Sequence, residues 1–478
     1  MTSPRGKLAR DSFWMIIVQI YGRGLSMVFS LYAAYALGVE NFGTYGYVMA
    51  IVAMISAVSD FGSNTYQVRQ TAIISDKDHC RLLLSNALFA RLALGMVGLI
   101  AIMILAMLLL EVRIVSWLII LFGLAMFFNN VNGAFMYTLI GREKFGLYGV
   151  ISAVSQTMNM GAACLLIYLG YGLLGIGYAF LGWGLLSLIL ISLVVSKRLY
   201  SPAVKFSRGE IIAFLKGAAP IGLTALLTTI YYKSDYIILE YFRGHTEVGL
   251  YNAAYVILNA LIFIPATISS TLLPRMSFFS ENDLVKLGIL YRHAFKYLLF
   301  AGFGLGFGTL AVSSNLIRAI YPEDFASAYL ALNILIWALA LIFVNSIQGS
   351  MIIAVGKQKL MPLITGSAAV VNIGLNLAVI PRYGIQGAAF TTVLAEIVAG
   401  GSCLYILRNF NGPANIMRIV IKTLIAGFSM YAFLLAIEHY SLFLRVPLGI
   451  VIYFAALVIL KGLTKTDLVP LKEMLKRG

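Results

Sequence analysis

Six ionisable side chains lie inside long apolar stretches of this sequence, where their chemistry is unusual. They are the basic residues Arg23, Arg91 and Lys233 and the acidic residues Asp60, Asp235 and Glu396. Basic groups in a medium of low dielectric constant attract anions such as phosphates strongly. Carboxyl groups in the same surroundings can take up and release a proton or a cation. These residue types therefore indicate anion binding together with proton or ion coupling.

The composition places these charges in a membrane protein. The chain has 478 residues, of which 61% are hydrophobic and only 11% charged, and its mean hydropathy is +0.92. A soluble chain has about 25% charged residues, and no soluble fold has enough interior for this much apolar surface. We predict an all-α integral membrane protein. The 3 cysteines and 4 histidines lie far apart, so their spacing indicates neither a metal site nor a disulfide framework.

About 14 segments are apolar over the ~20 residues that a membrane-spanning helix needs. The first runs from Phe13 to Gly38 and contains Gln19 and Arg23. It is longer than the apolar region of a signal peptide, which is about 7–15 residues, so we interpret it as a retained span. The predicted spans are residues 12–38, 43–68, 82–110, 114–139, 146–169, 173–196, 213–239, 248–273, 292–319, 326–353, 360–381, 384–407, 416–438 and 444–461.

Lysine and arginine are distributed unevenly between the two ends of these spans. Of the 35 basic residues, 27 flank the spans on the side of the two termini and 5 on the opposite side. Because basic loops stay in the cytoplasm, both termini are predicted to be cytoplasmic. The net charge of +16 follows this insertion rule and gives no reason to expect nucleic-acid binding.

Two stretches of the chain resemble each other at an offset of about 206 to 215 residues. Residues 141–180 and 356–390 both begin with a glycine in a basic loop, cross an Asn-bearing span and turn at a Tyr-Gly pair. A fainter match joins FGTYGYVMAI (residues 42–51) to VGLYNAAYVI (residues 248–257). The offset equals six spans, so we expect two like-oriented six-helix lobes related by an axis along the membrane normal. The predicted parts are residues 1–200 (spans 1–6), 201–410 (spans 7–12) and 411–478 (spans 13–14 and a cytoplasmic tail).

Lys233 and Asp235 lie two residues apart in the outer half of span 7, which is the repeat counterpart of span 1. Residues at this spacing point ~200° apart around a helix, so the two side chains cannot pair well. We expect Lys233 and Arg23, near the middle of span 1, to face a shared central cavity. The alternative for Lys233 is a side chain that extends to the outer surface. For Arg23 the alternative is a structural pair with Asp60.

The other polar residues inside the spans fit either helix–helix contacts or substrate contacts. Asp60 and Arg91, in the inner halves of spans 2 and 3, can pair with each other or contact a ligand. Glu396, midway along span 12, can titrate during transport or hydrogen-bond to Asn or Ser neighbours. Asparagines in spans can join helices or bind a sugar. We assign to substrate binding Arg23, Lys233, Arg91, Asn159 and Asn372, and to proton or ion coupling Asp60, Asp235 and Glu396.

Four short motifs follow one another along nearly the whole chain. They are LGVENFGTYGYV (Leu37 to Val48), DFGSNTYQVRQ (Asp60 to Gln70), KSDYIIL followed by VGLYNAAY (Lys233 to Tyr255) and LLPRMS (Leu272 to Ser277). With these motifs in this order and a plan of six, six and two spans, the chain resembles the multidrug/oligosaccharidyl-lipid/polysaccharide exporter superfamily. Within it, the chain is most similar to the polysaccharide branch, the O-antigen-type flippases.

This resemblance implies a protein of the cytoplasmic membrane of a bacterium or archaeon, with two lobes that open alternately to each membrane face. It implies a substrate in which an undecaprenyl diphosphate carries an oligosaccharide for surface polysaccharide. It also implies coupling to a proton or sodium gradient with no further cofactor, and the sequence has no P-loop motif for ATP. The implied partners are the lipid-linked oligosaccharide, membrane lipids and polysaccharide polymerase machinery.

Two other members of the same superfamily are alternatives, a lipid II flippase and a cation-coupled multidrug exporter. An exporter of cations favours acidic groups in its cavity. The charges inside the spans are three basic and three acidic, so composition does not exclude a multidrug exporter. A membrane glycosyltransferase or polymerase usually has a large catalytic loop, whereas no loop predicted here exceeds about 20 residues. We therefore predict a transporter and not an enzyme.

Overall fold

The computed structural model describes residues 4–74, 76–109, 113–203, 207–408, 410 and 416–463, and the predicted cytoplasmic tail beyond them lies outside the described residues. All regular secondary structure in these ranges is helical. The bilayer core offers no water to the backbone, and a helix satisfies its amide and carbonyl groups within one segment. The apolar composition and the helical structure therefore have the same physical cause.

The chain divides into two compact units, Met1–Asn252 and Ala253–Gly478. The first unit contains α1 (Pro4–Asp60), α2 (Ser63–Ile73), α3 (Lys77–Leu108), α4 (Arg113–Gly141), α5 (Phe145–Leu166), a π-helical turn η1 (Ile167–Tyr171), α6 (Gly172–Arg198) and α7 (Arg208–Arg243). Helix α8 (His245–Asn282) begins in the first unit and continues into the second. The second unit also contains α9 (Leu284–Ile320), η2 (Glu323–Phe325), α10 (Ala328–Ala354), η3 (Gln358–Leu360), α11 (Met361–Leu407), α12 (Ile416–Ala436) and α13 (Leu442–Ile459).

Glycines interrupt the longest helical stretches. Helix α1 bends at Gly38 (φ 75°, ψ 170°) and α11 at Gly384 (φ 51°, ψ −131°). Between α5 and α6 the chain turns at Gly172 (φ 55°, ψ −134°). Side chains with a Cβ rarely adopt such positive φ angles, which explains glycine at each position. Gly172 and Gly384 belong to the two Tyr-Gly turns of the sequence repeat, and their backbone angles are nearly the same.

Among the described residues, 11 helices are long and apolar enough to cross a membrane. The prediction of an all-α, multi-pass membrane protein is therefore confirmed. Three of these 11 are stretches of 50 residues or more, and each contains a glycine break where the sequence analysis separates two spans. The count of 14 spans, the orientation of the termini and the boundaries of the three predicted parts stay predictions.

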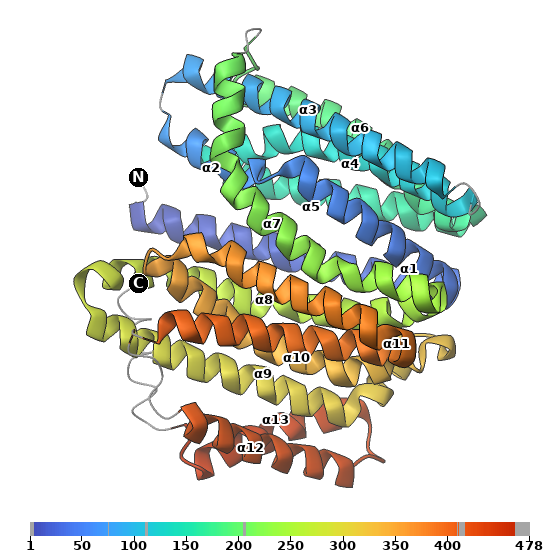
Figure 1. Cartoon of the computed structure of the whole chain (residues 1–478), viewed down its shortest axis with the longest axis vertical. Coiled ribbons are helices and arrows are strands. Elements are labelled where there is room, and N and C mark those ends of the chain that lie inside the picture. Colours follow the sequence, from blue (N-terminus) through green and yellow to red (C-terminus); the bar gives the residue numbers. More distant parts are fainter. Residues whose placement is uncertain are drawn as a thin grey trace. The chain divides into compact units, whose positions relative to one another are not determined.

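Within the first unit, α4 packs against α3 and α6, and α5 packs against α6 (Figure 1). Helix α1 contacts α3, α4, α5 and α7. The short α2 follows a tight turn at Phe61 and Gly62 (φ 41° and 78°). A Cβ at Gly62 would lie 2.5 Å from the backbone nitrogen of Gly222, so this glycine allows the turn to contact α7 directly.

Within the second unit, α9 lies between α10 and the α12–α13 pair, and α11 packs on α10 (Figure 1). Gly302 of α9 faces the backbone of Ala340, which brings α9 and α10 close together. Arg445 of α13 is only 1% exposed. It donates hydrogen bonds to Asn315 Oδ1 (3.2 Å) and the Ala311 carbonyl (3.0 Å) of α9, and to the Leu434 carbonyl (3.2 Å) of α12. This guanidinium therefore ties three helices together, although its sequence position, at the edge of the predicted span 444–461, places it among the 5 basic residues on the side opposite the termini.

Candidate functional site

Arg91, on α3, is the centre of a buried hydrogen-bond network in the first unit. Its exposed fraction is 1%. Nη2 donates to Asn64 Oδ1 (2.8 Å) and Gln67 Oε1 (3.1 Å) of α2, and Nη1 donates to the carbonyl (3.2 Å) and Oδ1 (3.3 Å) of Asn130 on α4. The Tyr137 ring lies 5.7 Å from the guanidinium carbon, within cation–π range. The network thus offsets much of the cost of burying this charge.

The neighbouring helices leave room for the guanidinium and orient its partners. A Cβ at Gly133 of α4 would lie 2.7 Å from Nη1, so only glycine fits there without displacing Arg91. Gln67 donates in turn to the Ala134 carbonyl (2.6 Å) and Thr138 Oγ1 (3.0 Å). Arg91 is therefore fixed by α2 and α4 together.

Asp60, at the end of α1, is the acidic partner of Arg91. Its Oδ1 lies 3.6 Å from Arg91 Nη1, which makes an ion pair but is too long for a hydrogen bond. Among the described residues, Asp60 Oδ1 has no hydrogen-bond partner, and the side chain is 25% exposed. The sequence leaves two partners open for Asp60, Arg23 and Arg91, and the structure places Arg91 beside it. The carboxylate keeps acceptor capacity for a proton, a cation or a ligand hydroxyl.

Both side chains line a polar cavity of about 380 Å³ in the first unit. This volume lies within the range of small-molecule sites, about 300–1,000 Å³. Its lining also includes the amides Asn64, Asn129 and Asn130 and the phenol of Tyr137. The remaining lining residues are Met49, Val52, Ala53, Ser56, Phe122, Ala125, Met126, Gly133 and Phe180. Donors, acceptors and one cation thus converge on a partly open space, beside apolar side chains.

Lys233 and Asp235, on α7, have different partners, as their spacing predicts. Lys233 Nζ lies 4.9 Å from the centre of the Tyr236 ring. Asp235 is fully buried and accepts a 2.6 Å hydrogen bond from Tyr251 OH on α8. Tyr236 OH donates to Asn252 Oδ1 (3.2 Å). The two charges therefore belong to a network of tyrosines that joins α7 to the start of α8.

Arg23 and Asn159 lie on α1 and α5, two helices that pack against each other. Beside them, Gln156 Nε2 donates to the Gly22 carbonyl and Ser26 Oγ, both at 3.2 Å. Arg23 is half-buried. Asn159 Oδ1 is buried and has no hydrogen-bond partner among the described residues. Their assignment to substrate binding stays a prediction.

Glu396 and Asn372, on α11 in the second unit, are both buried and hydrogen-bonded within that unit. Glu396 accepts a 2.8 Å bond at Oε2 from Asn345 Nδ2 of α10, which also donates to the Glu396 carbonyl (3.0 Å). Asn372 Oδ1 accepts from Asn376 Nδ2 (3.0 Å), and Asn376 is hydrogen-bonded to Thr391. These contacts join α10 to α11 and the two halves of α11 to each other. The assignments of Glu396 to coupling and Asn372 to substrate stay predictions.

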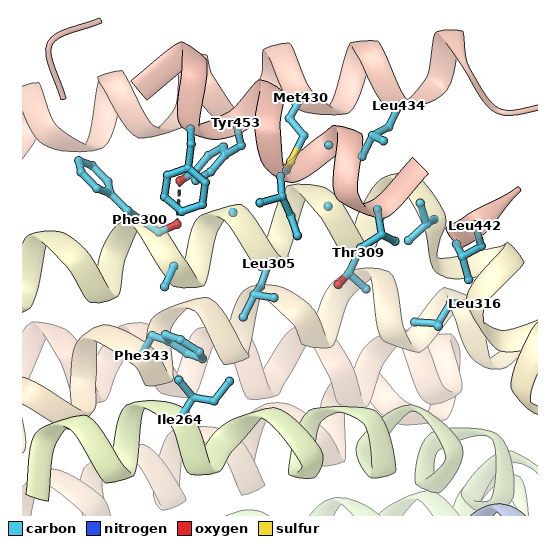
Figure 2. Close-up of a pocket in the computed structure, with 18 residues that line it drawn as sticks. Ile264, Phe300, Leu305, Thr309, Leu316, Phe343, Met430, Leu434, Leu442 and Tyr453 are labelled. Carbon is cyan, nitrogen blue, oxygen red and sulfur yellow. Dashed lines mark hydrogen bonds between the residues drawn. The ribbon is translucent and has the colours of Figure 1, made fainter. Parts of the chain in front are cut away.

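A second cavity, of about 440 Å³, lies in the second unit among α8, α9, α10, α12 and α13. Figure 2 shows aliphatic and aromatic side chains around it, including Leu305, Phe343, Met430 and Leu434. The hydroxyl of Tyr453 donates to the Phe300 carbonyl (2.7 Å) and is therefore already satisfied. Without charged or amide groups in its lining, this cavity fits an apolar guest and not a phosphate or a sugar.

Metal chemistry finds no support in the described part of the chain. There, no three His, Cys, Asp or Glu side chains come close enough to hold an ion. The cysteines Cys80, Cys164 and Cys403 are free thiols. The residues that sequence reasoning missed are Asn64 and Tyr137. Asn64 belongs to the DFGSNTYQVRQ motif and Tyr137 to α4, but only their positions on packed helices show that they line the same cavity as Arg91.

Long apolar helices around a polar cavity with buried charges define a multi-pass membrane protein with the organisation of a transporter. Residues 8–280 match the family model described as polysaccharide biosynthesis protein, and the chain belongs to this family. It is 23% identical to a probable low-salt glycan biosynthesis flippase of Haloferax volcanii, over 82% of this chain and 81% of that protein. It is 22% identical to a putative O-antigen transporter of Escherichia coli K12, over 86% of this chain and 99% of that protein.

Solved structures share the fold along most of the chain. The lipid II flippase MurJ, in an inward closed conformation, aligns with a TM-score of 0.78 at 17% identity, over 95% of this chain and 99% of that one. An inward-facing transporter of the multidrug-resistance MATE family aligns with a TM-score of 0.68 at 16% identity, over 84% and 94%. At these identities the likeness shows the fold alone. The family match confirms the resemblance to polysaccharide flippases that the sequence motifs suggest.

Proposed function

We propose that the protein is an alternating-access flippase that moves an undecaprenyl-diphosphate-linked oligosaccharide across the cytoplasmic membrane for surface polysaccharide biosynthesis. The observation that carries this proposal is the likeness, over more than four fifths of the chain, to a glycan flippase and an O-antigen transporter. Membership of a family of polysaccharide biosynthesis proteins supports it. Polymerase machinery on the outer side would then take over the oligosaccharide.

The chemistry of the first unit supports a sugar-bearing, anionic substrate. Amide and phenol groups in the cavity beside Arg91 are suited to the hydroxyl groups of a sugar. Arg23, Arg91 and Lys233 can attract a diphosphate, because cations act strongly on anions where water is scarce. The hydrocarbon tail needs no such groups and can stay in the bilayer. The apolar cavity of Figure 2 has the wrong lining for the head group.

The proposed coupling uses carboxyl groups and needs no bound cofactor. Asp60 has an acceptor oxygen without a hydrogen-bond partner and lies in the same cavity as Arg91. Protonation or cation binding there would change the charge beside the guanidinium, and with it the affinity for an anion. Asp235 and Glu396 are further candidates. A proton or sodium gradient would supply the energy.

Deletion of the gene tests the proposal and its rivals together. We expect undecaprenyl-linked oligosaccharide to accumulate on the cytoplasmic leaflet and surface glycan to disappear. The measurement is the accessibility of the lipid-linked sugar to a membrane-impermeant periodate reagent in oriented vesicles. Accumulation of lipid II instead would identify a lipid II flippase. Normal lipid-linked sugars together with greater drug sensitivity would identify a multidrug exporter.

A further inference from the structure

Helices α5 and α6 of the first unit form a groove that is separate from the two larger cavities. Its volume is about 250 Å³, and all its lining residues belong to these two helices. The floor is buried, since Ser187 and Ile191 are 1% and 4% exposed. The rim is open, because Val150, Val154 and Leu190 are about half exposed. We call this space the α5–α6 groove.

The polar side chains in the lining are already hydrogen-bonded. Trp183 Nε1 donates to Ser155 Oγ (2.7 Å) and so joins the two helices. The Ser187 hydroxyl donates to the Gly184 carbonyl (3.0 Å) and accepts from Asn132 Nδ2 (3.3 Å). The other lining residues are aliphatic. The groove therefore fits a hydrocarbon chain and not a sugar or a phosphate.

The length of the groove corresponds to one leaflet of the bilayer. On α6 its lining runs from Trp183, near the middle of the helix, to Val194, near its end. At 1.5 Å per residue this stretch is ~16 Å long. Half of a hydrocarbon core of ~30 Å is ~15 Å. One acyl chain of a phospholipid can therefore lie along the groove from the membrane surface to its middle.

Basic side chains lie at the end of the groove that we predict to be cytoplasmic. Lys197 and Arg198 end α6 about one turn beyond the groove, and Lys144 lies directly before α5. All three are exposed. Glu143 is an acidic neighbour in the same loop, so three positive charges and one negative charge give a net +2. This end of the groove therefore favours an anion.

Helix periodicity places these charges on the face that forms the groove. Arg198 follows Val194 by 4 residues, and Lys144 precedes Ile151 by 7 residues. Residues at these spacings share one face of a helix. Basic pockets between membrane helices on the cytoplasmic side bind anionic lipid head groups.

We propose that the α5–α6 groove binds one anionic phospholipid of the cytoplasmic leaflet. Its acyl chain lies between α5 and α6, and its phosphate contacts Lys144, Lys197 and Arg198. The apolar lining selects a hydrocarbon chain, and the basic end selects an anionic over a zwitterionic head group. This inference goes beyond the proposed function and does not rest on it, because the lipid stays in its leaflet and is not transported.

Trp183 provides a direct test, because bromine atoms on an acyl chain quench tryptophan fluorescence on contact. The substitutions Trp14→Phe, Trp117→Phe and Trp337→Phe leave Trp183 as the single tryptophan. The protein is placed in vesicles of phosphatidylcholine and phosphatidylglycerol. The bromines are carried either by the phosphatidylglycerol or by an equal amount of the phosphatidylcholine. A matched control retains only Trp117, which is exposed on α4 and does not line the groove.

We expect phosphatidylglycerol to bind beside Trp183 at least fivefold more strongly than phosphatidylcholine, as calculated from the quenching. Trp117 should be quenched equally by both lipids. Equal quenching of Trp183 by both lipids would show ordinary bilayer contact and overturn the site. Relief of the quenching by less polyprenyl phosphate than phosphatidylglycerol would assign the groove to a lipid carrier and overturn the assigned phospholipid.

Two variants separate the basic end from the apolar lining. The first should lose the head-group preference and carries Lys144→Gln, Lys197→Gln and Arg198→Gln. Its matched control loses the same charge at exposed positions of α2, α3 and α7, should keep the preference, and carries Arg69→Gln, Lys77→Gln and Lys216→Gln.

The second variant, Val154→Phe, fills the groove from its half-exposed rim without a change of charge. It should reduce the quenching of Trp183 by brominated phosphatidylglycerol at least twofold. A preference that survives neutralisation of the basic end, or unchanged quenching in Val154→Phe, would overturn the proposal.

Discussion

At the scale of single residues, Arg91 shows how a buried charge becomes a structural centre and a functional group at once. Four hydrogen bonds to α2 and α4 hold the guanidinium, and the pair with Asp60 points toward the cavity. Removal of one member of such a network leaves the others buried and unpaired. Substitutions of Arg91 and of Asp60 should therefore have different effects.

The substitution Arg91→Met should lower the free energy of unfolding by about 3 kcal/mol, because it leaves buried amide oxygens without their donor and the Asp60 carboxylate without its countercharge. The measurement is the thermal unfolding midpoint in detergent. Arg69→Met, at an exposed position of α2, is the matched control and should leave the midpoint nearly unchanged. Equal midpoints for the two variants would show that the network does not stabilise the fold.

The substitution Asp60→Asn should spare stability but remove coupling. Asparagine has the same shape, and Arg91 keeps its four hydrogen bonds, none of which involves Asp60. We expect the stimulation of flipping by a proton or sodium gradient to fall at least tenfold in proteoliposomes. Asp78→Asn, in the exposed first turn of α3, serves as the control. Normal gradient dependence of Asp60→Asn would move the coupling role to Asp235 or Glu396.

The double substitution Arg23→Ala with Lys233→Ala tests the predicted cationic cavity. Because both charges are assigned to the diphosphate, surface glycan export should fall at least tenfold while the protein remains in the membrane. Export is measured by complementation of the deletion strain, with immunoblots for protein amount. Lys216→Ala, at an exposed position of α7, is expected to export normally. Normal export by the double variant contradicts the assignment.

Sequence reasoning found most charged members of these networks but not their surroundings. Arg91 and Asp60 were notable because ionisable groups are rare in apolar spans. The choice of Arg91 over Arg23 as a neighbour of Asp60 depends on how α2 turns at Gly62 and packs on α4, which no local pattern encodes. For the same reason, the sequence places Arg445 only at the edge of the predicted span 444–461 and does not show its burial. Its burial depends on helices more than 100 residues away.

At the scale of elements, the repeat is expressed in the backbone at its turning points. Gly172 and Gly384 occupy equivalent places in the sequence and share a conformation that is nearly closed to other residues. Both follow a tyrosine, and the Tyr-Gly turn was visible in the sequence. The breaks inside long helices were therefore predictable, whereas the π-helical turn before Gly172 was not, because it depends on local packing.

The substitution Gly384→Ala should destabilise the protein by about 2 kcal/mol, because a Cβ is strained at this φ and ψ. Gly374→Ala in the same helix is the matched control. A Cβ there has no neighbour within 4 Å, so alanine should be neutral or stabilise by up to about 1 kcal/mol. The difference between the two thermal midpoints is the measurement. A Gly384→Ala midpoint at or above that of Gly374→Ala would show that the turn tolerates a side chain.

At the scale of the whole molecule, the fold class followed from composition because the bilayer restricts the chain to helices. The uneven distribution of lysine and arginine makes a further prediction about orientation. Alkaline phosphatase fused after the last residue, Gly478, should be inactive, and a fluorescent protein fused there should fluoresce. Phosphatase inserted after His439, between predicted spans 13 and 14, should be active. The reverse pattern would invert every assignment of inside and outside made above.

The clamp formed by Arg445 bears on the order in which the protein is made. Asn315 and Ala311 leave the ribosome about 130 residues before the arginine that binds them. Chains are synthesised from the N-terminus, and earlier parts begin to fold first. Until α13 has entered the membrane, α9 and α12 lack the bridge between them. A nascent chain that stalls shortly before Arg445 would therefore expose an incomplete helix contact to quality-control proteases, although all but one of the long apolar helices in the described residues had been inserted.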